Sequence, residues 1–468
     1  MLDAGHYSEP RLPHLKPMNY RESLHELLSL GHELRGVKFD LEAIRKLAQA
    51  LGSPHLEYPS VLIAGTNGKG STASFLASIL ERAGYRAGLY TSPHLVRPNE
   101  RICVSGNEID DPNFAAAYTE VRRAADRLIA GGELAHLPSF FETLTAMAFH
   151  HFRASKIDFA VLEVGMGGRL DATNIVKPRV SIITNIGFDH MDFLGHTLNA
   201  IASEKAGIIK AGIPVVSGVK EPEAADVIRR RAAELHAPLI ETFESARALD
   251  PTSHHGRYTF HVPAGSAGLL KIDVPLAGKF QMQNATAAVL AASELRRQGF
   301  AISGKNIIDG IRNTRWPGRL EPILQKPLVL LDGAHNPDAA RFIAQFVREE
   351  LAGRPMKLVY ASMRDKAIVQ IGELLFPLAD ELWITQTDQA RAASPEEIIA
   401  IVGKGAWRFH AEPDPVRAAN AAIEAAAEAD VVLVTGSLFL VGAVRSAWLQ
   451  RLIHDRQTAT VTPFPATI

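Results

Sequence analysis

The chain has 468 residues, of which 47% are hydrophobic and 22% charged, so it can bury ordinary cores and is expected to form two or three domains. Its 50 Lys and Arg residues balance 51 Asp and Glu residues, for a formal net charge of -1. Such a balance provides no overall attraction for nucleic acid or for an anionic membrane. Any phosphate chemistry must therefore be local.

The same composition favours a cytoplasmic protein. The single cysteine, Cys103, cannot form an internal disulfide. The polar, proline-containing stretch Met1–Tyr20 lacks the apolar core of a signal peptide. No segment reaches the roughly 18 uninterrupted apolar residues that would span a bilayer. We expect neither a membrane nor a nucleic-acid partner.

Along the chain, short β-prone apolar runs alternate with longer Ala- and Leu-rich segments at helical spacing. This alternation predicts βα units around a parallel sheet, and hence an α/β fold. The first series of predicted strands is Val61–Ala64, Ala87–Tyr90, Phe159–Val164, Val180–Asn185 and Pro214–Ser217. The polar, Gly-containing stretch Asp250–Lys271 predicts hairpins or loops on that layer.

The alternation then restarts. The second series of predicted strands is Leu328–Leu331, Lys357–Tyr360, Glu381–Ile384 and Val431–Thr435. Between the two series, Pro317 and Gly318 interrupt the stretch Thr314–Leu320. We place the domain boundary there, which predicts domains at 1–318 and 319–468.

The first strand runs into a glycine-rich turn, Gly65–Ser71, with the sequence GTNGKGS. A helix is expected to begin near Lys69, so the N–H groups of the turn and the N-terminus of the helix converge on one anion site. Lys69 supplies a charge, and the Ser71 hydroxyl can meet a phosphate or Mg²⁺. The alternative is a tight βα turn with a solvated lysine.

The spacing of this turn departs from the standard phosphate loop. Gly65 and Gly68 are closer together than its two leading glycines, and Gly70 separates Lys69 from Ser71. The departure argues against a G protein, a motor or a kinase.

Two further polar stretches follow predicted strands, where open α/β sheets bind ligands. Glu163 closes the run Phe159–Leu162, and a carboxylate there can hold Mg²⁺. Asp189 and His190 follow the next strand in the same way. Taken singly, each is as easily a satisfied loop side chain as a metal ligand. Beside a phosphate loop, the ligand interpretation is favoured.

Several motifs occur together in one order: GTNGKGS at 65–71, YTSPHL at 90–95, E at 163 with GMGGRLDATN at 165–174, TNIGFDH at 184–190, EKAGI at 204–208, DGAHNP at 332–337 and TGSL at 435–438. With these motifs in this order, the chain resembles the folylpolyglutamate synthase/dihydrofolate synthase family of the Mur ligase superfamily. The resemblance implies a phosphate-loop parallel-sheet ATPase domain followed by a smaller Rossmann-like ligase domain. It further implies a monomer that uses ATP to join L-glutamate to dihydropteroate and to tetrahydrofolate.

In this family the ATP γ-phosphate first activates a carboxylate, and the glutamate amine then displaces phosphate from the acyl phosphate. Both transition states gather negative charge, so Lys69 and two Mg²⁺ ions are expected to stabilise them. By resemblance, Ser92 and Glu163 hold one Mg²⁺ and His190 the other.

Lys205 matches a lysine that the family carbamylates with CO₂. A carbamate is an anionic oxygen ligand, whereas an ammonium group would repel Mg²⁺. The alternative is an exposed helix lysine paired with Glu204.

The resemblance also assigns residues around the nucleotide. Asn284 alone would more often be a helix or cap residue, Arg319 a surface cation and Asp332 an N-cap. His335 would orient the acyl phosphate or receive the proton of the amine, although a loop histidine titrates near neutrality without being catalytic. The predicted nucleotide set is Thr66, Asn67, Gly68, Lys69, Gly70, Ser71, Asn284, Arg319 and Asp332, and the predicted catalytic set is Lys69, Lys205 and His335. ATP would then lie between two domains that close over it.

For the pterin end, aromatic rings can stack on the flat group while a carboxylate accepts its N–H bonds. One of the two phenylalanines is equally well a core residue, since successive helix positions do not share a face. The predicted set is Ser139, Phe140, Phe141, Glu142, Leu170, Asp171 and Ala172.

The stretch GGRLDATN with Arg169 is more similar to the bifunctional bacterial type than to the type that acts only as a folylpolyglutamate synthase. Two other interpretations stay open. A cell-wall Mur ligase would use a UDP-linked acceptor, but Gly65 lies too near the N-terminus to leave room for a typical UDP-binding domain of about 100 residues. A nucleotide-dependent regulatory switch would need no organised carboxylate, histidine and lysine.

Overall fold

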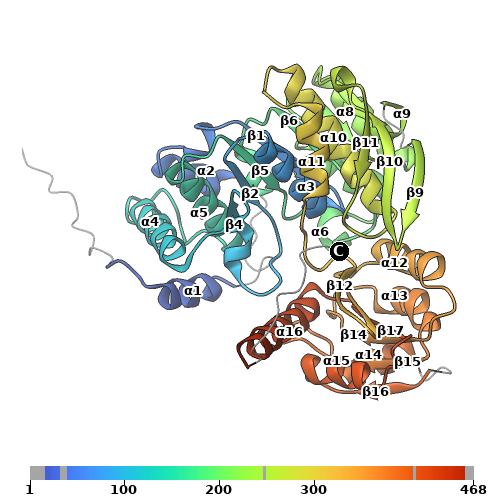
Figure 1. Ribbon diagram of the computed structural model, residues 1–468. Coiled ribbons are helices and arrows are strands. Elements are labelled where there is room, and N and C mark those ends of the chain that lie inside the picture. The colour runs from blue at the N-terminus through green and yellow to red at the C-terminus, as the bar shows by residue number, and fades with distance from the viewer. Residues whose placement is uncertain (1–15, 32–39, 246–248, 404–406, 459–468) are drawn as a thin grey trace, which may run out of the picture.

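The structure, a computed structural model, describes residues 16–31, 40–245, 249–403 and 407–458. Most of the stretch used above to argue against a signal peptide lies outside these ranges. Figure 1 shows two lobes stacked on one another, each built around its own parallel sheet. We call the lobe that contains the first series of strands the N-terminal lobe, and the other the C-terminal lobe.

Within the described residues, the sheet of the N-terminal lobe has eight strands in the order β4-β3-β2-β5-β1-β6-β7-β8. The strands β2, β5, β1, β6, β7 and β8 are parallel to one another. The strands β3 and β4 add an antiparallel edge next to β2. Their bounds are β1 Ser60–Ala64, β2 Ala87–Tyr90, β3 Ile102–Val104, β4 Asn107–Glu108, β5 Phe159–Glu163, β6 Val180–Ile183, β7 Val215–Ser217 and β8 Leu239–Glu241. The five predicted strands are confirmed, with ends that differ by one or two residues.

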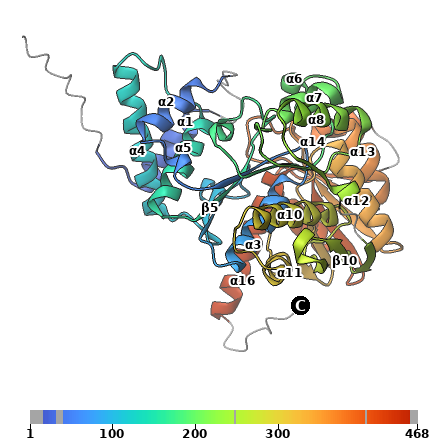
Figure 2. The ribbon, with the colours of Figure 1, turned by 90° about the horizontal axis from the view of Figure 1, so that it is seen from above.

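Both faces of this sheet are covered, which explains why its strands are continuously apolar. Leu62 and Ala64 of β1 face one core, and Val61 and Ile63 face the other. On the first face lie α1 (Tyr20–Ser29), α2 (Glu42–Ala50), α4 (Asp111–Ala130), α5 (Phe140–Ala154), α7 (Leu198–Ala206) and α8 (Pro222–Glu234). On the second lie α3 (Lys69–Arg82), α10 (Phe280–Arg297) and α11 (Gly304–Arg312), which Figure 2 shows side by side.

The predicted hairpins form a small antiparallel sheet. Its strands are β9 (Leu249–His254), β10 (Arg257–Pro263) and β11 (Leu269–Asp273). The sheet packs on α10 and α11, and it reaches the C-terminal lobe at α12 (Figure 1). There Ser253 Oγ donates to Glu350 Oε1 at 2.6 Å, and a Cβ on Gly256 would lie 2.3 Å from the Phe346 ring.

The C-terminal lobe has its own sheet, in the order β12-β13-β17-β14-β15-β16 over the described residues. Its bounds are β12 Glu321–Gln325, β13 Leu328–Leu331, β14 Met356–Tyr360, β15 Glu381–Ile384, β16 Phe409–Ala411 and β17 Val431–Thr435. One face is covered by α12 (Pro337–Glu350), α13 (Ile368–Leu375) and α14 (Pro395–Val402), and the other by α15 (Pro415–Glu424) and α16 (Leu438–Thr458). All four predicted strands are confirmed, and the exact boundary between the domains stays a prediction.

The described part of the chain contains no helix both long and apolar enough to cross a membrane. Two short helices complete the N-terminal lobe, α6 (Met191–Leu194) and α9 (Thr242–Ser245).

Candidate active site

A cavity of about 320 Å³ lies where the carboxyl ends of the two parallel sheets meet. Its walls come from both lobes, as expected when ligands bind beyond the carboxyl ends of parallel strands. The predicted residues that line it are Thr66, Asn67, Gly68, Lys69, Gly70, Ser71, Ser92, Phe140, Glu163, His190, Lys205, Asn284, Arg319, Asp332 and His335. The structure therefore brings the predicted nucleotide, metal and catalytic residues to one place.

The glycine-rich turn forms a backbone cradle between β1 and α3. Asn185 Oδ1 accepts hydrogen bonds from the N–H groups of Thr66 at 3.1 Å and Asn67 at 2.8 Å, which holds the turn from behind. Lys69 Nζ donates to the Thr66 carbonyl at 3.1 Å. Gly68 precedes the first residue of α3 with φ +81°, a conformation that favours glycine. The predicted strand, turn and helix are confirmed.

Two glycines of the turn are required by close neighbours. A Cβ on Gly68 would lie 2.2 Å from Asn284 Oδ1, and one on Gly70 would lie 2.8 Å from the Trp316 ring. Asn284 itself is anchored, because its Nδ2 donates to Gln281 Oε1 at 2.9 Å. The side chains of Asn284, in α10, and Trp316, in the segment between α11 and β12, therefore pack against the turn.

Glu163 ends β5 inside the cavity. Its Oε2 accepts the Ser92 N–H at 3.1 Å, and the residue is only 4% exposed. Burial raises the pKa of the carboxyl group, while the charges of Lys69 and Arg319 act against the rise. A buried carboxylate needs a compensating cation.

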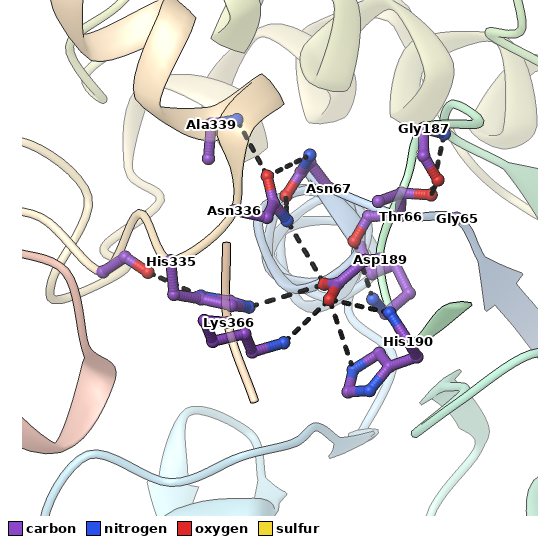
Figure 3. Close-up of polar contacts among 12 residues, drawn as sticks. Gly65, Thr66, Asn67, Gly187, Asp189, His190, His335, Asn336, Ala339 and Lys366 are labelled. Carbon is purple, nitrogen blue, oxygen red and sulfur yellow. Dashed lines mark hydrogen bonds and ion pairs between the residues drawn. The ribbon is translucent and has the colours of Figure 1, made fainter. Parts of the chain in front are cut away.

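Asp189 connects the two lobes (Figure 3). Its Oδ1 lies 2.7 Å from Lys366 Nζ, and its Oδ2 accepts from Asn336 Nδ2 at 3.2 Å. Oδ2 also lies 3.7 Å from His335 Nε2. Burial acts to raise the pKa of Asp189, but the nearby His335, His190 and Lys366 outweigh it and hold the pKa well below its usual range. Asp189 is thus an ion-pair partner of the C-terminal lobe.

His190 follows Asp189 in a left-handed conformation, with φ +50°. Burial is the main reason why its pKa falls to about 4, and the nearby Lys366 adds to the shift while Asp189 opposes it. A neutral imidazole is the form that binds metals.

His335 and Asp332 lie in the loop after β13, and hydrogen bonds to backbone groups fix their side chains. His335 Nδ1 donates to the Gly333 carbonyl at 2.8 Å, which directs Nε2 towards Asp189. Asp332 accepts the N–H groups of Leu320 at 2.9 Å and Ala334 at 2.8 Å. Burial raises the pKa of Asp332, and the charge of Arg319 opposes the rise.

Lys205 is buried, with 4% exposure, and its Nζ donates to the Gly65 carbonyl at 2.9 Å. Burial, together with the charge of Lys69, lowers its pKa to about 7. The alternative of an exposed lysine paired with Glu204 is wrong, because Glu204 pairs with Arg169 at 2.9 Å.

A second cavity, of about 230 Å³, opens beside the first. Among its walls are most of the predicted pterin residues: Ser139, Phe141, Glu142, Leu170, Asp171 and Ala172. Phe140 instead lines the first cavity and is buried, so one phenylalanine faces each cavity.

Both carboxylates of the predicted pterin set, Asp171 and Glu142, are already hydrogen-bonded. Asp171 accepts the N–H groups of Gly165 at 2.9 Å and Thr173 at 2.9 Å, and Glu142 accepts the N–H of Ser139 at 2.8 Å in a capping box at the start of α5. The carboxylates of Asp171 and Glu142 therefore shape the cavity walls, and contact with a pterin stays a prediction.

Several residues of the site were not predicted from the sequence. Arg101, only 2% exposed, donates from Nε to His94 Nδ1 at 2.8 Å and lies 5.3 Å from the Phe140 ring centre. Burial and the charge of Arg101 lower the pKa of His94 to about 3. Lys366 and Asn336 were also missed. The sequence carried one usable signal, since Asn336 stands directly before the proline that begins α12 and caps that helix.

A phosphate loop that faces a second α/β lobe across a shared cavity defines a two-lobed ligase of the Mur type. The family model described as the Mur ligase middle domain matches residues 137–292, and the one described as the Mur ligase glutamate ligase domain matches residues 318–438.

Curated relatives narrow this class. The chain is 35% identical over 415 residues to the dihydrofolate synthase/folylpolyglutamate synthase of Bacillus subtilis, covering 88% of this chain and 95% of the relative. It is 33% identical to the folylpolyglutamate synthase of Lacticaseibacillus casei, covering 92% and 99%. The chain belongs to the dihydrofolate synthase/folylpolyglutamate synthase family and is an ATP-dependent ligase.

Solved structures agree with the fold. Escherichia coli FolC in complex with DHPP and ADP superposes with a TM-score of 0.81 at 31% identity, over 93% of this chain and 99% of that one. Mycobacterium tuberculosis folylpolyglutamate synthase complexed with ADP gives a TM-score of 0.85 at 31% identity, over 92% and 99%. The predicted phosphate-loop ATPase domain with a C-terminal ligase domain is confirmed.

Proposed function

We propose that the cleft between the lobes adds L-glutamate both to dihydropteroate and to tetrahydrofolate, through an acyl phosphate made with ATP. The observation that carries the proposal is the shared cavity, in which the phosphate loop and Glu163 of one lobe meet Asp332, His335 and Lys366 of the other. The complex of E. coli FolC with DHPP and ADP supports it, because that relative binds the nucleotide ADP together with a second small molecule, DHPP.

In this proposal the nucleotide phosphates lie on the turn at Thr66–Ser71, while Asn284, Arg319 and Asp332 contact the rest of the nucleotide. The free N–H groups at the start of α3 and the charge of Lys69 favour phosphate oxygens. Since Arg319 and Asp332 belong to the segment before β12 and the end of β13, ATP would be held by both lobes.

The donor groups at the predicted metal site fit Mg²⁺. Glu163 and Ser92 offer a buried carboxylate and a hydroxyl, and Mg²⁺ prefers oxygen ligands. No group of three or more His, Cys, Asp or Glu side chains able to hold a metal occurs among the described residues. This sparse donor set suits Mg²⁺, which is usually bound by one or two carboxylates together with phosphates and water. Bound there, and at a second position near His190, Mg²⁺ would neutralise charge on the transferred phosphoryl group.

We also propose that Lys205 is carbamylated. Because its pKa is lowered to about 7, a large share of the side chain is a neutral amine at neutral pH. The amine nitrogen can bond to the carbon of CO₂ and release a proton, which replaces a buried cation by an anionic oxygen ligand beside the phosphate loop.

The remaining residues bind and orient the reactants. Lys69 would stabilise the phosphoryl group during transfer to the substrate carboxylate. His335, with Nδ1 fixed on the Gly333 carbonyl, would orient the acyl phosphate or receive the proton of the glutamate amine at Nε2. The pterin would occupy the second cavity between Phe141 and Leu170.

The test is product formation. The protein, ATP, Mg²⁺, bicarbonate and L-glutamate are incubated with dihydropteroate or tetrahydrofolate, and the products are measured by mass spectrometry. Glutamate added to both acceptors is expected. Addition to tetrahydrofolate alone would restrict the function to folylpolyglutamate synthesis, and turnover of neither would overturn the proposal. A cytoplasmic location and a monomeric state complete it, resting on the single cysteine and the family resemblance.

A further inference from the structure

Arg391 stands at the neck between the two cavities. The residues common to both walls are Gly165, Met166, Gly167, His190, Leu194 and Arg391. Of this set, all but Arg391 come from the N-terminal lobe. Arg391 follows β15 in the C-terminal lobe, and it is the only lysine or arginine among these six residues.

The neighbouring backbone fixes Arg391 in place. Its carbonyl accepts the Arg364 N–H at 2.9 Å, and the next residue, Ala392, forms a β-bridge with Met363. Its side chain is 41% exposed, and Nη1 lies 3.0 Å from Asp365 Oδ1. A guanidinium has five N–H donors, so this single contact leaves it able to bind another carboxylate.

The acidic side chains around the second cavity have hydrogen-bond donors other than Arg391. Each already accepts a hydrogen bond from within its own lobe: Asp40 from the Glu42 N–H, Glu142 from Ser139, Asp171 from the N–H groups of its loop, and Glu204 from Arg169. Arg169 uses Nε and Nη2 together on Glu204, at 3.1 and 2.9 Å. Arg169 lines the second cavity alone, whereas Arg391 lines both cavities, so an anion that enters the neck meets the donors of Arg391.

The chemistry of the two acceptors shows which anion this would be. If, as in the proposed function, the carboxylate to be phosphorylated lies at Lys69 and the pterin in the second cavity, the intervening part of the substrate passes through the neck. A folate ends in glutamate, whose α-carboxylate is four carbon–carbon bonds from the reacting γ-carboxyl carbon. Dihydropteroate ends in an aminobenzoate and has no second carboxylate.

We propose that Arg391 binds the α-carboxylate of the terminal glutamate of folate substrates and so favours glutamylated acceptors over dihydropteroate. The inference rests on the proposed function and deepens it. Arg391 is a specificity-determining residue in this account, with no part in phosphoryl transfer.

The experiment compares both acceptors in the variants Arg391→Ala and Arg391→Lys. With Arg391→Ala, the KM for tetrahydrofolate should rise by about 10- to 100-fold, the size of a charge-assisted hydrogen bond, while the kinetics with dihydropteroate stay unchanged. Arg391→Lys should recover part of the loss, since it keeps the charge without the fork. Arg417→Ala, an exposed arginine of the same lobe paired with Glu412, is the matched control and should change neither acceptor.

A second measurement needs no variant. With the wild-type protein, tetrahydrofolate whose α-carboxylate is converted to the primary amide should show the same rise in KM over unmodified tetrahydrofolate. With Arg391→Ala, the acid and the amide should have the same KM. Equal losses for both acceptors, or a wild-type protein indifferent to the amide, would overturn the role of Arg391 alone. A wild-type protein that turns over neither acceptor would overturn the proposed function and this inference with it.

Discussion

Lys366 Nζ lies 2.7 Å from Asp189 Oδ1, and the pair joins the loop after β6 in one lobe to the loop before α13 in the other. Both side chains are nearly buried, with 12% and 11% exposure. His335 and Asn336 approach the second oxygen of the same carboxylate (Figure 3). The carboxylate of Asp189 thus holds together the two walls of the cavity.

Removal of this link should reduce both catalysis and folding stability. In Asp189→Asn, Lys366 keeps its charge without a counterion, so the lobes should spend less time in the closed arrangement, and kcat/KM should fall by about tenfold or more. Steady-state kinetics and thermal unfolding measure the two effects separately. Lys326→Met, which breaks an exposed pair with Glu428, is the control and should leave both quantities nearly unchanged. An Asp189→Asn enzyme with normal kinetics would show that the link is dispensable.

The pKa of Asp189 makes a prediction about acid. Because the folded state holds this pKa well below its usual range, the carboxylate stabilises the fold at neutral pH, and that stability is lost as pH falls through the lowered pKa. Between pH 5 and 7 the pair should therefore remain intact. Unfolding of the wild-type protein and of Asp189→Asn over this range should differ by a constant amount, and a difference that disappeared by pH 5 would contradict the ion pair.

Carbamylation of Lys205 predicts a labelled product. With ¹³C-bicarbonate, the protein should show one carbamate resonance in the NMR spectrum, stronger as pH rises through about 7 because the free amine becomes more abundant. Lys205→Arg should lose both the resonance and nearly all activity.

Lys210 offers a matched control on the same segment. Its Nζ donates to the Asn174 carbonyl at 3.1 Å, and burial also lowers its pKa. Lys210→Met should keep the resonance and the activity. A resonance that survived in Lys205→Arg would assign the carbamate to another residue.

The phosphate loop predicts a contrast between two glycines that flank α3, Gly68 before it and Gly84 after it. In Gly68→Ala, the added Cβ would lie 2.2 Å from Asn284 Oδ1, so the turn must distort and ATP binding should be lost. Gly84→Ala also places alanine at positive φ but meets no atom within 4 Å, so it should cost about 1 kcal/mol of stability and leave ATP binding intact. Nucleotide titration with thermal unfolding checks both. If the folded Gly68→Ala variant bound ATP tightly, the glycine-rich turn would not be part of the ATP site.

The capping box at the second cavity predicts a loss specific to the pterin substrates. Ser139→Ala should cost about 1 kcal/mol of stability and raise the KM for both acceptors, because the first turn of α5 places Phe140 and Phe141. Ser303→Ala removes the equivalent box from α11, which lines neither cavity, and should cost similar stability with no change in KM. Identical kinetics for the two variants would argue against a pterin at this wall.

The sequence predicted the strands at the centres of both sheets, since strands buried on two faces read as continuous apolar runs such as Val61–Ala64 and Val431–Thr435. It missed β3, β4, β8, β12 and β16, which lie at or beside the sheet edges. Those strands are short or half-exposed, so their composition does not set them apart from loops.

The candidate site divides in the same way. Residues inside ordered motifs, such as Lys69, Glu163 and His335, were predicted and do converge. Lys366 and Arg391 lie in loops without a recognisable motif, so the sequence alone does not distinguish them from ordinary surface cations. Their roles depend on how the C-terminal lobe sits over the N-terminal lobe, which no local pattern specifies.

In the proposed function, one cleft phosphorylates the substrate carboxylate before glutamate is joined to it. The direct measurement uses dihydropteroate and tetrahydrofolate labelled with ¹⁸O in the reacting carboxylate, with ATP, Mg²⁺, bicarbonate and L-glutamate, followed by mass spectrometry of the released phosphate. Transfer of one ¹⁸O atom to phosphate from each acceptor is the predicted result. Amide product formed with unlabelled phosphate would contradict the acyl phosphate and the account built on it.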